Sequence, residues 1–372
     1  FYQLIYKILN SCYYIVKKSV GLKAKGKQYI KGGFYVTQII GIDVGYGFVK
    51  VTDGQIGYSF PSVVGEGHTK PTFSTKIGPS PAIDNLKIGI GDRLFFVGKS
   101  AIKHSRFAYR DLSYTRSISD DLEILFFSAL SLFAKDVTNV FNVVTGLPVE
   151  RMHLAEDFIN RVKGERNITL YNGAANRSIK INVSDIEVVP QPLGTYWSSI
   201  SNSAIAPDGR IGVVDIGFKT TDFATIEDSE YIPEKSKSIL VGLATAYDDI
   251  GSNLVTEFGV EKESYALDGI VINRKINISG ETIDISSIVE SAFEKLATNI
   301  LVEIHSQWNV SEFDCLLLTG GGGQALSSYM LPKLSNAKLA LDPITANCRG
   351  YLTWADRLWN HSYPQNSNLK FD

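Results

Sequence analysis

The sequence predicts an α/β fold made of two related halves with a cleft between them. Two stretches, 42–50 and 214–222, share one design: an apolar run ends on an aspartate, a glycine follows two residues later, and a β-type run resumes. Both halves then alternate short strand patterns with helical periodicity, which is typical of α/β proteins. A third apolar strand is followed by four consecutive glycines. We therefore expect a duplicated domain, since a chain of 372 residues can hold two copies.

The first 36 residues differ from the rest of the chain. Apolar residues recur there at helical spacing up to Val16, with Lys7, Lys17 and Lys18 among them. One interpretation is that residues 1–20 form a helix lying on a membrane surface. The other, which we favour, is an N-terminal extension at 1–36 that precedes the first domain. No run reaches the roughly 18 apolar residues that a membrane-spanning helix needs.

The first domain is expected at 37–208. Mixed short strands and loops at 61–118 indicate an insertion, and a turn signal, Ala-Pro-Asp-Gly at 206–209, marks the end of the domain. Acidic residues followed by apolar residues at helical spacing predict a helix at 121–137. The other expected elements are strands at 36–42, 48–52, 55–60, 141–145, 168–171, 178–183 and 186–189, and helices at 149–162 and 190–203.

The second domain is expected at 209–346, with a second insertion at about 260–285. Its clearest element is a helix at 288–308, because the apolar residues there share one face. The other expected elements are strands at 211–215 and 315–318, a helix at 244–258, and a closing helix at 349–360. We expect the segment 347–372 to return to the first domain.

Composition limits the classes of function. The chain is 44% apolar and 20% charged, as in a globular protein with a sizeable core. Its net charge of −2 and pI near 6.3 provide no field that would attract nucleic acid, so direct nucleic-acid binding is not expected. Cys12, Cys315 and Cys348 are scattered, which fits a reducing compartment, and a cytoplasmic location is expected. Cys315 lies in an apolar run and is expected to be buried.

Three motifs occur in order along the chain: the two aspartate hairpins at 41–50 and 213–222, and the glycine run at 318–323. This arrangement resembles the actin, Hsp70 and sugar-kinase ATPase superfamily, whose fold is a duplicated, ribonuclease H-like α/β domain. Within it the chain is similar to prokaryotic actin-like proteins, namely the plasmid-partition filament proteins and their archaeal relatives. The resemblance covers roughly residues 37 to 362. Its details are Asp-Val-Gly-Tyr-Gly at 43–47, Phe-Pro-Ser at 60–62, Thr-Gly-Leu-Pro at 145–148, Gln-Pro-Leu-Gly at 191–194 and Asn-Cys-Arg-Gly-Tyr at 347–351.

The resemblance implies a nucleotide, ATP or alternatively GTP, held between two phosphate hairpins and an adenosine loop, with Mg²⁺ between Asp43 and Asp215. The implied nucleotide contacts are Asp43, Gly45, Tyr46, Gly47, Lys50, Gly217, Thr220, Thr221, Asp222, Gly320, Gly321, Gly322 and Gly323. Glycines suit this task because they let phosphate oxygens approach the backbone N–H groups, and four together would let the backbone pass flat against the adenosine. Mg²⁺ keeps much of its water shell, so two carboxylates suffice.

Hydrolysis needs a group that orients the attacking water. The resemblance makes Gln191 that group, with Asp215 the nearby carboxylate, because a glutamine cannot take a proton. For Gln191 a turn residue, and for Lys50 a solvated strand residue, remain the alternatives. Tyr46 either covers the site or points into the core. Lys219 either neutralises phosphate charge or faces water.

The leading functional hypothesis is an ATPase that polymerises into filaments, either for segregating plasmid or other DNA or as cytoskeleton. Its expected partners are copies of itself and a separate DNA-binding adaptor; a membrane would join them only if residues 1–20 form a surface helix. A small-molecule kinase of the same fold is the alternative, and Asp185 is the nearest candidate for its catalytic base. A chaperone would need a substrate domain, for which few residues remain after Arg349.

Overall fold

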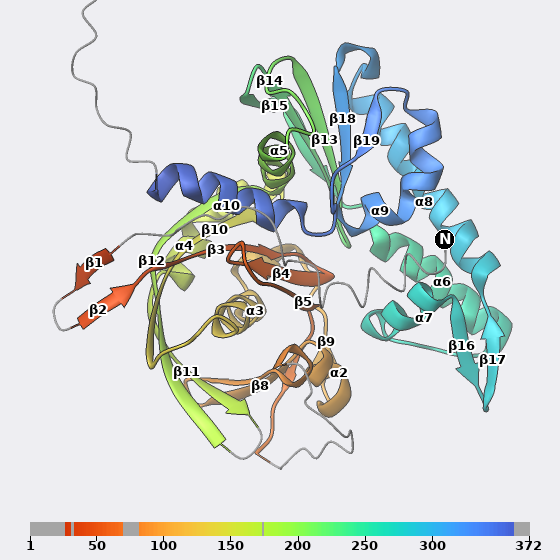
Figure 1. Ribbon diagram of the computed structural model, residues 1–372. Coiled ribbons are helices and arrows are strands. Elements are labelled where there is room, and N and C mark those ends of the chain that lie inside the picture. The colour runs from red at the N-terminus through yellow and green to blue at the C-terminus, as the bar shows by residue number, and fades with distance from the viewer. Residues whose placement is uncertain (1–26, 31–32, 70–81, 173–174, 361–372) are drawn as a thin grey trace, which may run out of the picture.

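Two twisted sheets with helices packed between and around them form the molecule (Figure 1). The computed structural model describes residues 27–30, 33–69, 82–172 and 175–360. The proposed surface helix at 1–20 therefore lies outside the described residues. The observed architecture confirms the predicted duplicated α/β fold with two sheet-bearing halves.

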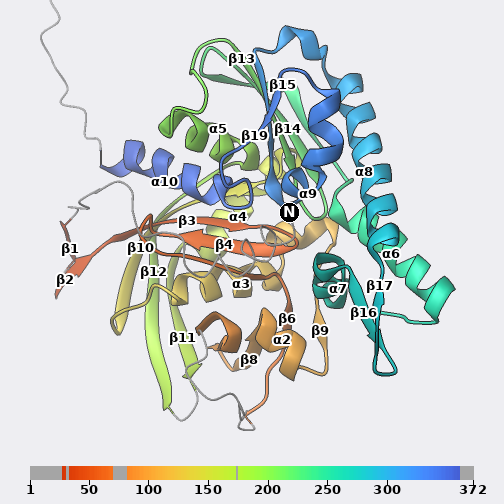
Figure 2. The same cartoon turned by 45° about the vertical axis from the view of Figure 1, so that its right-hand side comes forward.

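The first sheet has ten strands within the described residues, in the order β5-β4-β3-β10-β12-β11-β7-β8-β6-β9. They are β3 (Gln38–Val44), β4 (Phe48–Thr52), β5 (Gly57–Pro61), β6 (Val64–Glu66), β7 (Lys87–Ile90), β8 (Arg93–Val97), β9 (Ala108–Tyr109), β10 (Thr138–Leu147), β11 (Gly164–Asn172) and β12 (Ala175–Pro190). The sheet curls around helix α3 (Asp120–Ser131), as Figure 2 shows. Because α3 is apolar nearly all round, its buried residues and the inner faces of the strands form one core.

The second sheet has five strands within the described residues, in the order β15-β14-β13-β18-β19. They are β13 (Arg210–Ile216), β14 (Thr221–Glu227), β15 (Glu230–Ile239), β18 (Cys315–Thr319) and β19 (Ala337–Leu339). In each sheet a hairpin, β3–β4 or β13–β14, pairs in parallel with the strand that returns after the helices, β10 or β18. This shared topology is the structural form of the sequence repeat.

Helices α5 (Gln191–Ser201) and α10 (Ala346–Trp359) pack against each other between the two sheets (Figure 1). A Cβ on Gly350 would collide with the carbonyl oxygen of Gly194, so both glycines are needed for this close approach. Next to them the rings of Trp197 and Trp354 stack with centroids 4.5 Å apart. The close packing fixes α5, and with it Gln191, relative to the first sheet.

The remaining elements complete the outer layers. The other α-helices are α2 (Lys99–His104), α4 (Ala155–Val162), α6 (Leu243–Phe258), α7 (Leu267–Asn273), α8 (Ser286–Gln307) and α9 (Gly320–Met330). Short 3-10 helices are η1 (Ala82–Asn85), η2 (Tyr114–Ile118), η3 (Val149–Leu154), η4 (Ser264–Ala266), η5 (Val310–Glu312) and η6 (Leu331–Lys333). Two small hairpins are β1 (Lys27–Ile30) with β2 (Gly33–Val36), and β16 (Lys275–Ile278) with β17 (Glu281–Asp284).

Several predicted elements differ from the observed ones. The helix expected at 121–137 ends at Ser131, because the Asn139 side chain accepts hydrogen bonds from the N–H groups of Lys135 and Asp136 and holds a turn there. The helix expected at 149–162 divides into η3 and α4. The strands expected at 178–183 and 186–189 are one strand, β12, since a bulge beside Asn142 absorbs the irregularity.

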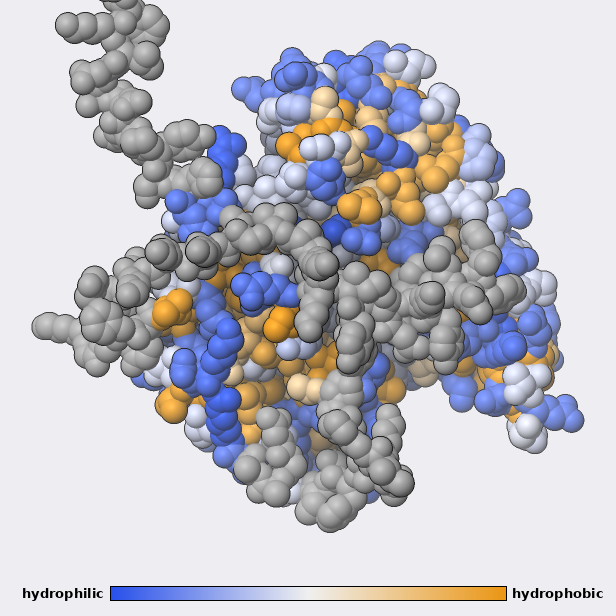
Figure 3. All heavy atoms as spheres, in the orientation of Figure 1, coloured by the Kyte–Doolittle hydropathy of each residue, from blue (hydrophilic) through white to orange (hydrophobic). Residues whose placement is uncertain are grey.

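On the face shown in Figure 3, hydrophilic residues are interspersed with patches of hydrophobic residues. Several large apolar side chains are more than half exposed, among them Ile56, Phe107, Val302 and Leu341. Cys315 is buried, as predicted, and so is Cys348. In the part of the chain that the structure describes, no helix combines the length and apolar character needed to cross a bilayer.

Candidate functional site

The tips of the two aspartate hairpins touch each other. A Cβ on Gly47, in the first tip, would lie 2.9 Å from Cβ of Phe218 in the second tip, so only glycine permits this contact. Tyr46 is 7% exposed and packs in the core of the second half, with Ile216 and Phe218. The Tyr46 ring therefore packs in the core of the opposite half, and it also lines a cavity beside Gln191. The hairpins form one joined unit across the molecule.

Asp43 lies near the tip of the first hairpin, one residue before the end of β3, and is almost completely buried. Its Oδ2 pairs with Nζ of Lys50 at 3.1 Å, and its Oδ1 accepts a hydrogen bond from Nε2 of Gln191 at 3.3 Å. Burial alone would lower the pKa of Lys50, but the charge of Asp43 and its hydrogen bond, with Asp215 beyond, outweigh burial and raise it. Lys50 is therefore a charged partner of Asp43, with a side chain that is only 15% exposed, rather than a solvated strand residue.

Asp215 occupies the equivalent place on the second hairpin and is also buried. Its Oδ2 accepts a hydrogen bond of 2.6 Å from Nδ2 of Asn347, at the start of α10, which in turn accepts one from Thr195. Burial, together with the charges of Asp222 and Asp43, raises the pKa of Asp215 from 3.8 to about 7. A buried carboxylate with a pKa raised in this way is typical of a functional site.

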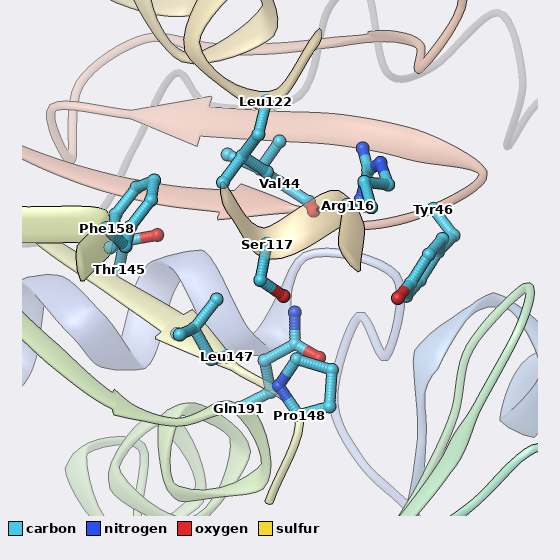
Figure 4. Close-up of a pocket in the computed structure, with 11 residues that line it drawn as sticks. Val44, Tyr46, Arg116, Ser117, Leu122, Thr145, Leu147, Pro148, Phe158 and Gln191 are labelled. Atoms are coloured by element: carbon cyan, nitrogen blue, oxygen red, sulfur yellow. Dashed lines mark hydrogen bonds between the residues drawn. The ribbon is translucent and has the colours of Figure 1, made fainter. Parts of the chain in front are cut away.

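Gln191 begins helix α5 directly after strand β12 and is 9% exposed. It lines a small cavity with Ser117, Thr145 and Pro148, drawn in Figure 4 with Tyr46, Arg116 and the apolar residues around them. The cavity volume is about 10 Å³, close to the space that one water molecule requires. Gln191 thus joins two features, the buried Asp43 carboxylate and a cavity of water size, which a simple turn residue would not.

The side chains of the second hairpin are used within the protein. Asp222 accepts hydrogen bonds from the N–H of Val149 at 2.9 Å, from Thr220 at 3.0 Å and from the hydroxyl of Ser238. The hydroxyl of Thr221 donates to the carbonyl of Val241 at 2.7 Å. The structure therefore does not direct these hydroxyls and Asp222 toward the first hairpin. Contacts of these side chains with phosphate remain predictions. Asp222 links the second hairpin to η3 through its hydrogen bond from the N–H of Val149.

The glycine run has a different shape from the flat loop that was expected. Gly320 has a left-handed backbone (φ +81°), and Gly320, Gly321, Gly322 and Gly323 form the first turn of helix α9. A Cβ on Gly320 would collide with Asp215, and one on Gly322 would collide with Ile216, so glycine is required for the helix to begin over the second hairpin. The run thus places the N-terminus of α9 beside Asp215, with the N–H of Gly320 bonded to the carbonyl of Pro343 at 3.1 Å. A role in binding adenosine stays a prediction.

A second set of contacts between the halves was not predicted. Arg110, after β9, binds Asp268 of α7 through two hydrogen bonds of 3.3 and 2.5 Å, and both side chains are buried. The Arg110 guanidinium also lies 4.5 Å from the ring of Phe218, whose edge-to-face neighbour is Tyr247. Both arginines of this region, Arg110 and Arg116, come from a stretch without periodicity, so the sequence offered no signal for them.

The other candidates lie apart from these contacts. Lys219 is half-buried in the second tip. Asp185, the candidate base of a small-molecule kinase, pairs with Lys163 at 3.1 Å and accepts a hydrogen bond from Trp359. It does not line the cavity with Gln191. Among the described residues no group of three or more histidine, cysteine or acidic side chains forms a metal cluster.

Comparison with known proteins agrees with this arrangement. The model "Actin like proteins N terminal domain" matches residues 41–194, and "Archaeal actin homologue MreB-like, C-terminal" matches residues 213–330. No curated protein matches the sequence.

Solved structures similar to this chain include a 15-stranded ParM filament from Clostridium botulinum, with 25% identity and a TM-score of 0.75 over 86% of this chain and 99% of that one. An archaeal actin homolog in complex with ADP has 20% identity and a TM-score of 0.71, over 86% and 99% of the two chains. A ParM from Bacillus thuringiensis with AMPPNP has 17% identity and a TM-score of 0.64, over 87% and 99%.

Proposed function

Since the chain belongs to the prokaryotic actin-like proteins, of the actin, Hsp70 and sugar-kinase superfamily, we propose that it binds and hydrolyses ATP between its halves and polymerises. The observation that carries the proposal is the meeting of the two hairpin tips with Asp43 and Asp215 buried beside them. Structures of similar proteins hold ADP or AMPPNP, which supports an adenine nucleotide over GTP.

Mg²⁺ fits the residues that are present. Asp43 and Asp215 offer the hard carboxylate oxygens that it prefers, and one or two carboxylates are its usual protein share when phosphates and waters complete the shell. The raised pKa of Asp215 reflects a negative charge that burial and neighbouring carboxylates disfavour. A cation there would favour the ionised form. When bound, Mg²⁺ would supply charge neutralisation for the phosphates.

The residues of this chain have separable tasks in the proposed reaction. Lys50 places a positive charge between Asp43 and the second hairpin, where it compensates phosphate charge. Gln191, facing a cavity of about 10 Å³, orients a single water. Its amide cannot accept the proton of that water. Asp215 is the proposed nearby carboxylate.

Polymerisation is proposed from the likeness to ParM filaments, one of which is 25% identical over 86% of this chain. Filaments arise from a heterologous interface whose rotation does not close a ring. The two halves contact each other at Tyr46, at Asp222 and at Arg110, and through these contacts nucleotide binding sets the angle between the halves. That angle controls which surfaces match between copies. A separate DNA-binding adaptor, and a role in plasmid segregation, complete the proposal.

Sedimentation tests the proposal. Purified protein with Mg-ATP is expected to pellet and to show filaments by electron microscopy, whereas Asp215→Ala with Mg-ATP stays in the supernatant. The matched control is Asp157→Ala, at an exposed position on α4, which should pellet and turn over nucleotide like the wild type. Failure of the wild type to pellet at any workable concentration would refute polymerisation. ATP turnover that requires an added small alcohol or acid would favour a kinase instead.

A further inference from the structure

Arg116 holds the first hairpin from one side. From helix η2 its Nη1 donates to the carbonyl of Val44 and its Nη2 to the carbonyl of Gly45, each at 3.1 Å. Ser62 adds two bonds, from its hydroxyl to Gly45 at 2.6 Å and from its N–H to Gly47 at 2.9 Å. Three carbonyls of a single turn are therefore fixed by two residues from outside the hairpin.

Because the peptide group is planar, the direction of these carbonyls also fixes the direction of the neighbouring N–H groups. In a trans peptide the C=O and the N–H of the next residue point in opposite directions. Because the carbonyls of Val44 and Gly45 both point at one guanidinium, the N–H groups of Gly45 and Tyr46 point to the other side of the turn. Successive N–H groups held in this way form an anion-binding concavity.

The charge of Arg116 also favours an anion at this turn. The side chain is buried, and its residue is 3% exposed. Within the described ranges it forms no ion pair; its contacts are the two carbonyls and the ring of Tyr46, 4.7 Å away. A buried positive charge without a directly bonded carboxylate is costly, although the charges of Asp111, Asp121 and Asp43 act on Arg116 from a distance. A polyphosphate on the far side of the turn would add further negative charge.

We infer that Arg116 is a positioning residue that orients the first hairpin for phosphate binding and adds positive charge behind it. The inference rests on the proposed nucleotide function. It assigns to η2, a segment without a recognisable motif, part of the affinity for the phosphate chain. Arg116 acts through the hairpin backbone.

The test compares Arg116→Lys and Arg116→Gln with the wild type by titration calorimetry with Mg-ATP, Mg-ADP and adenosine, well below the melting temperature. Arg166→Gln is the control, because Arg166 on strand β11 likewise donates to two backbone carbonyls and lies over an aromatic ring, Phe127, although unlike Arg116 it also pairs with Glu123 at 3.3 Å. We expect Arg116→Gln to raise the Kd for Mg-ATP about tenfold or more and to leave adenosine binding unchanged. Arg116→Lys is expected to fall between, and Arg166→Gln to match the wild type.

A folded Arg116→Gln protein with wild-type Kd for Mg-ATP would overturn the inference and leave the proposed function intact. Equal loss of affinity for ATP and adenosine would also overturn it, since that is the result of general destabilisation. Ser62→Ala, which removes one bond to the same carbonyl of Gly45, keeps the test decisive if Arg116→Gln does not fold. A wild type that binds no nucleotide would instead refute the proposed function.

Discussion

Replacing Asp215 by asparagine should stabilise the nucleotide-free protein at neutral and higher pH. The folded-state pKa of Asp215 is about 7 and its ordinary value is 3.8, because burial and two neighbouring carboxylates disfavour the charge. At about 1.36 kcal/mol per pKa unit, this difference corresponds to about 4 kcal/mol of destabilisation. The cost is absent below pH 3.8, grows as the pH rises, and is complete above pH 7. Asparagine has the same shape and carries no charge.

Urea unfolding at several pH values, without Mg²⁺ or nucleotide, measures this effect. We expect the free energy of unfolding of the wild type to fall relative to that of Asp215→Asn between pH 4 and pH 7, and the two to be close at pH 4. The control Asp157→Asn, exposed on α4, should follow the wild type throughout. A constant difference between the wild type and Asp215→Asn over this range would refute the reasoning, because it would mean that Asp215 keeps an ordinary pKa.

Three further perturbations follow from the contacts of the site. Gln191→Ala should lower single-turnover ATP hydrolysis by about 10²-fold while the Kd for Mg-ATP stays near that of the wild type, and an unchanged rate would remove Gln191 from the mechanism. Arg110→Met should destabilise the protein by about 3–5 kcal/mol in urea unfolding, because Asp268 is left buried without its partner; adding Asp268→Leu should recover much of the loss, and no recovery would argue against this ion pair. Gly47→Ala should weaken Mg-ATP binding in calorimetry, since its methyl group meets Phe218, and wild-type affinity would show that the hairpin tips do not need their contact.

Much of the fold could be predicted because its signals are local. Apolar runs that end on Asp43 and Asp215 reveal the hairpins, and the helical face of 288–308 reveals α8. The helix at 121–137 was predicted too long because a local side-chain contact, Asn139 on the backbone N–H groups of Lys135 and Asp136, holds a turn after the helix. Apolar periodicity does not show which backbone groups a polar side chain will bond.

The site was predictable only in part, for a related reason. Motifs identified Asp43, Gln191 and Asp215, since turn chemistry and spacing are written along the chain. The resemblance implied an adenosine loop at the glycine run; the structure begins α9 there, since nothing larger than glycine fits at Gly320 and Gly322 over the second hairpin. Arg116 was missed because its role depends on hydrogen bonds to the carbonyls of Val44 and Gly45, which are far from it in the sequence.

Titration calorimetry with ATP, in Mg²⁺ and in excess chelator, tests the central claim that the two hairpins hold one nucleotide and its cation. The account predicts one ATP per chain in Mg²⁺, strongly weakened by chelator and by Asp43→Ala or Asp215→Ala alone, because the carboxylates act from opposite hairpins on one site. If the wild type binds Mg-ATP and both Asp43→Ala and Asp215→Ala bind it with the same Kd, the claim is contradicted.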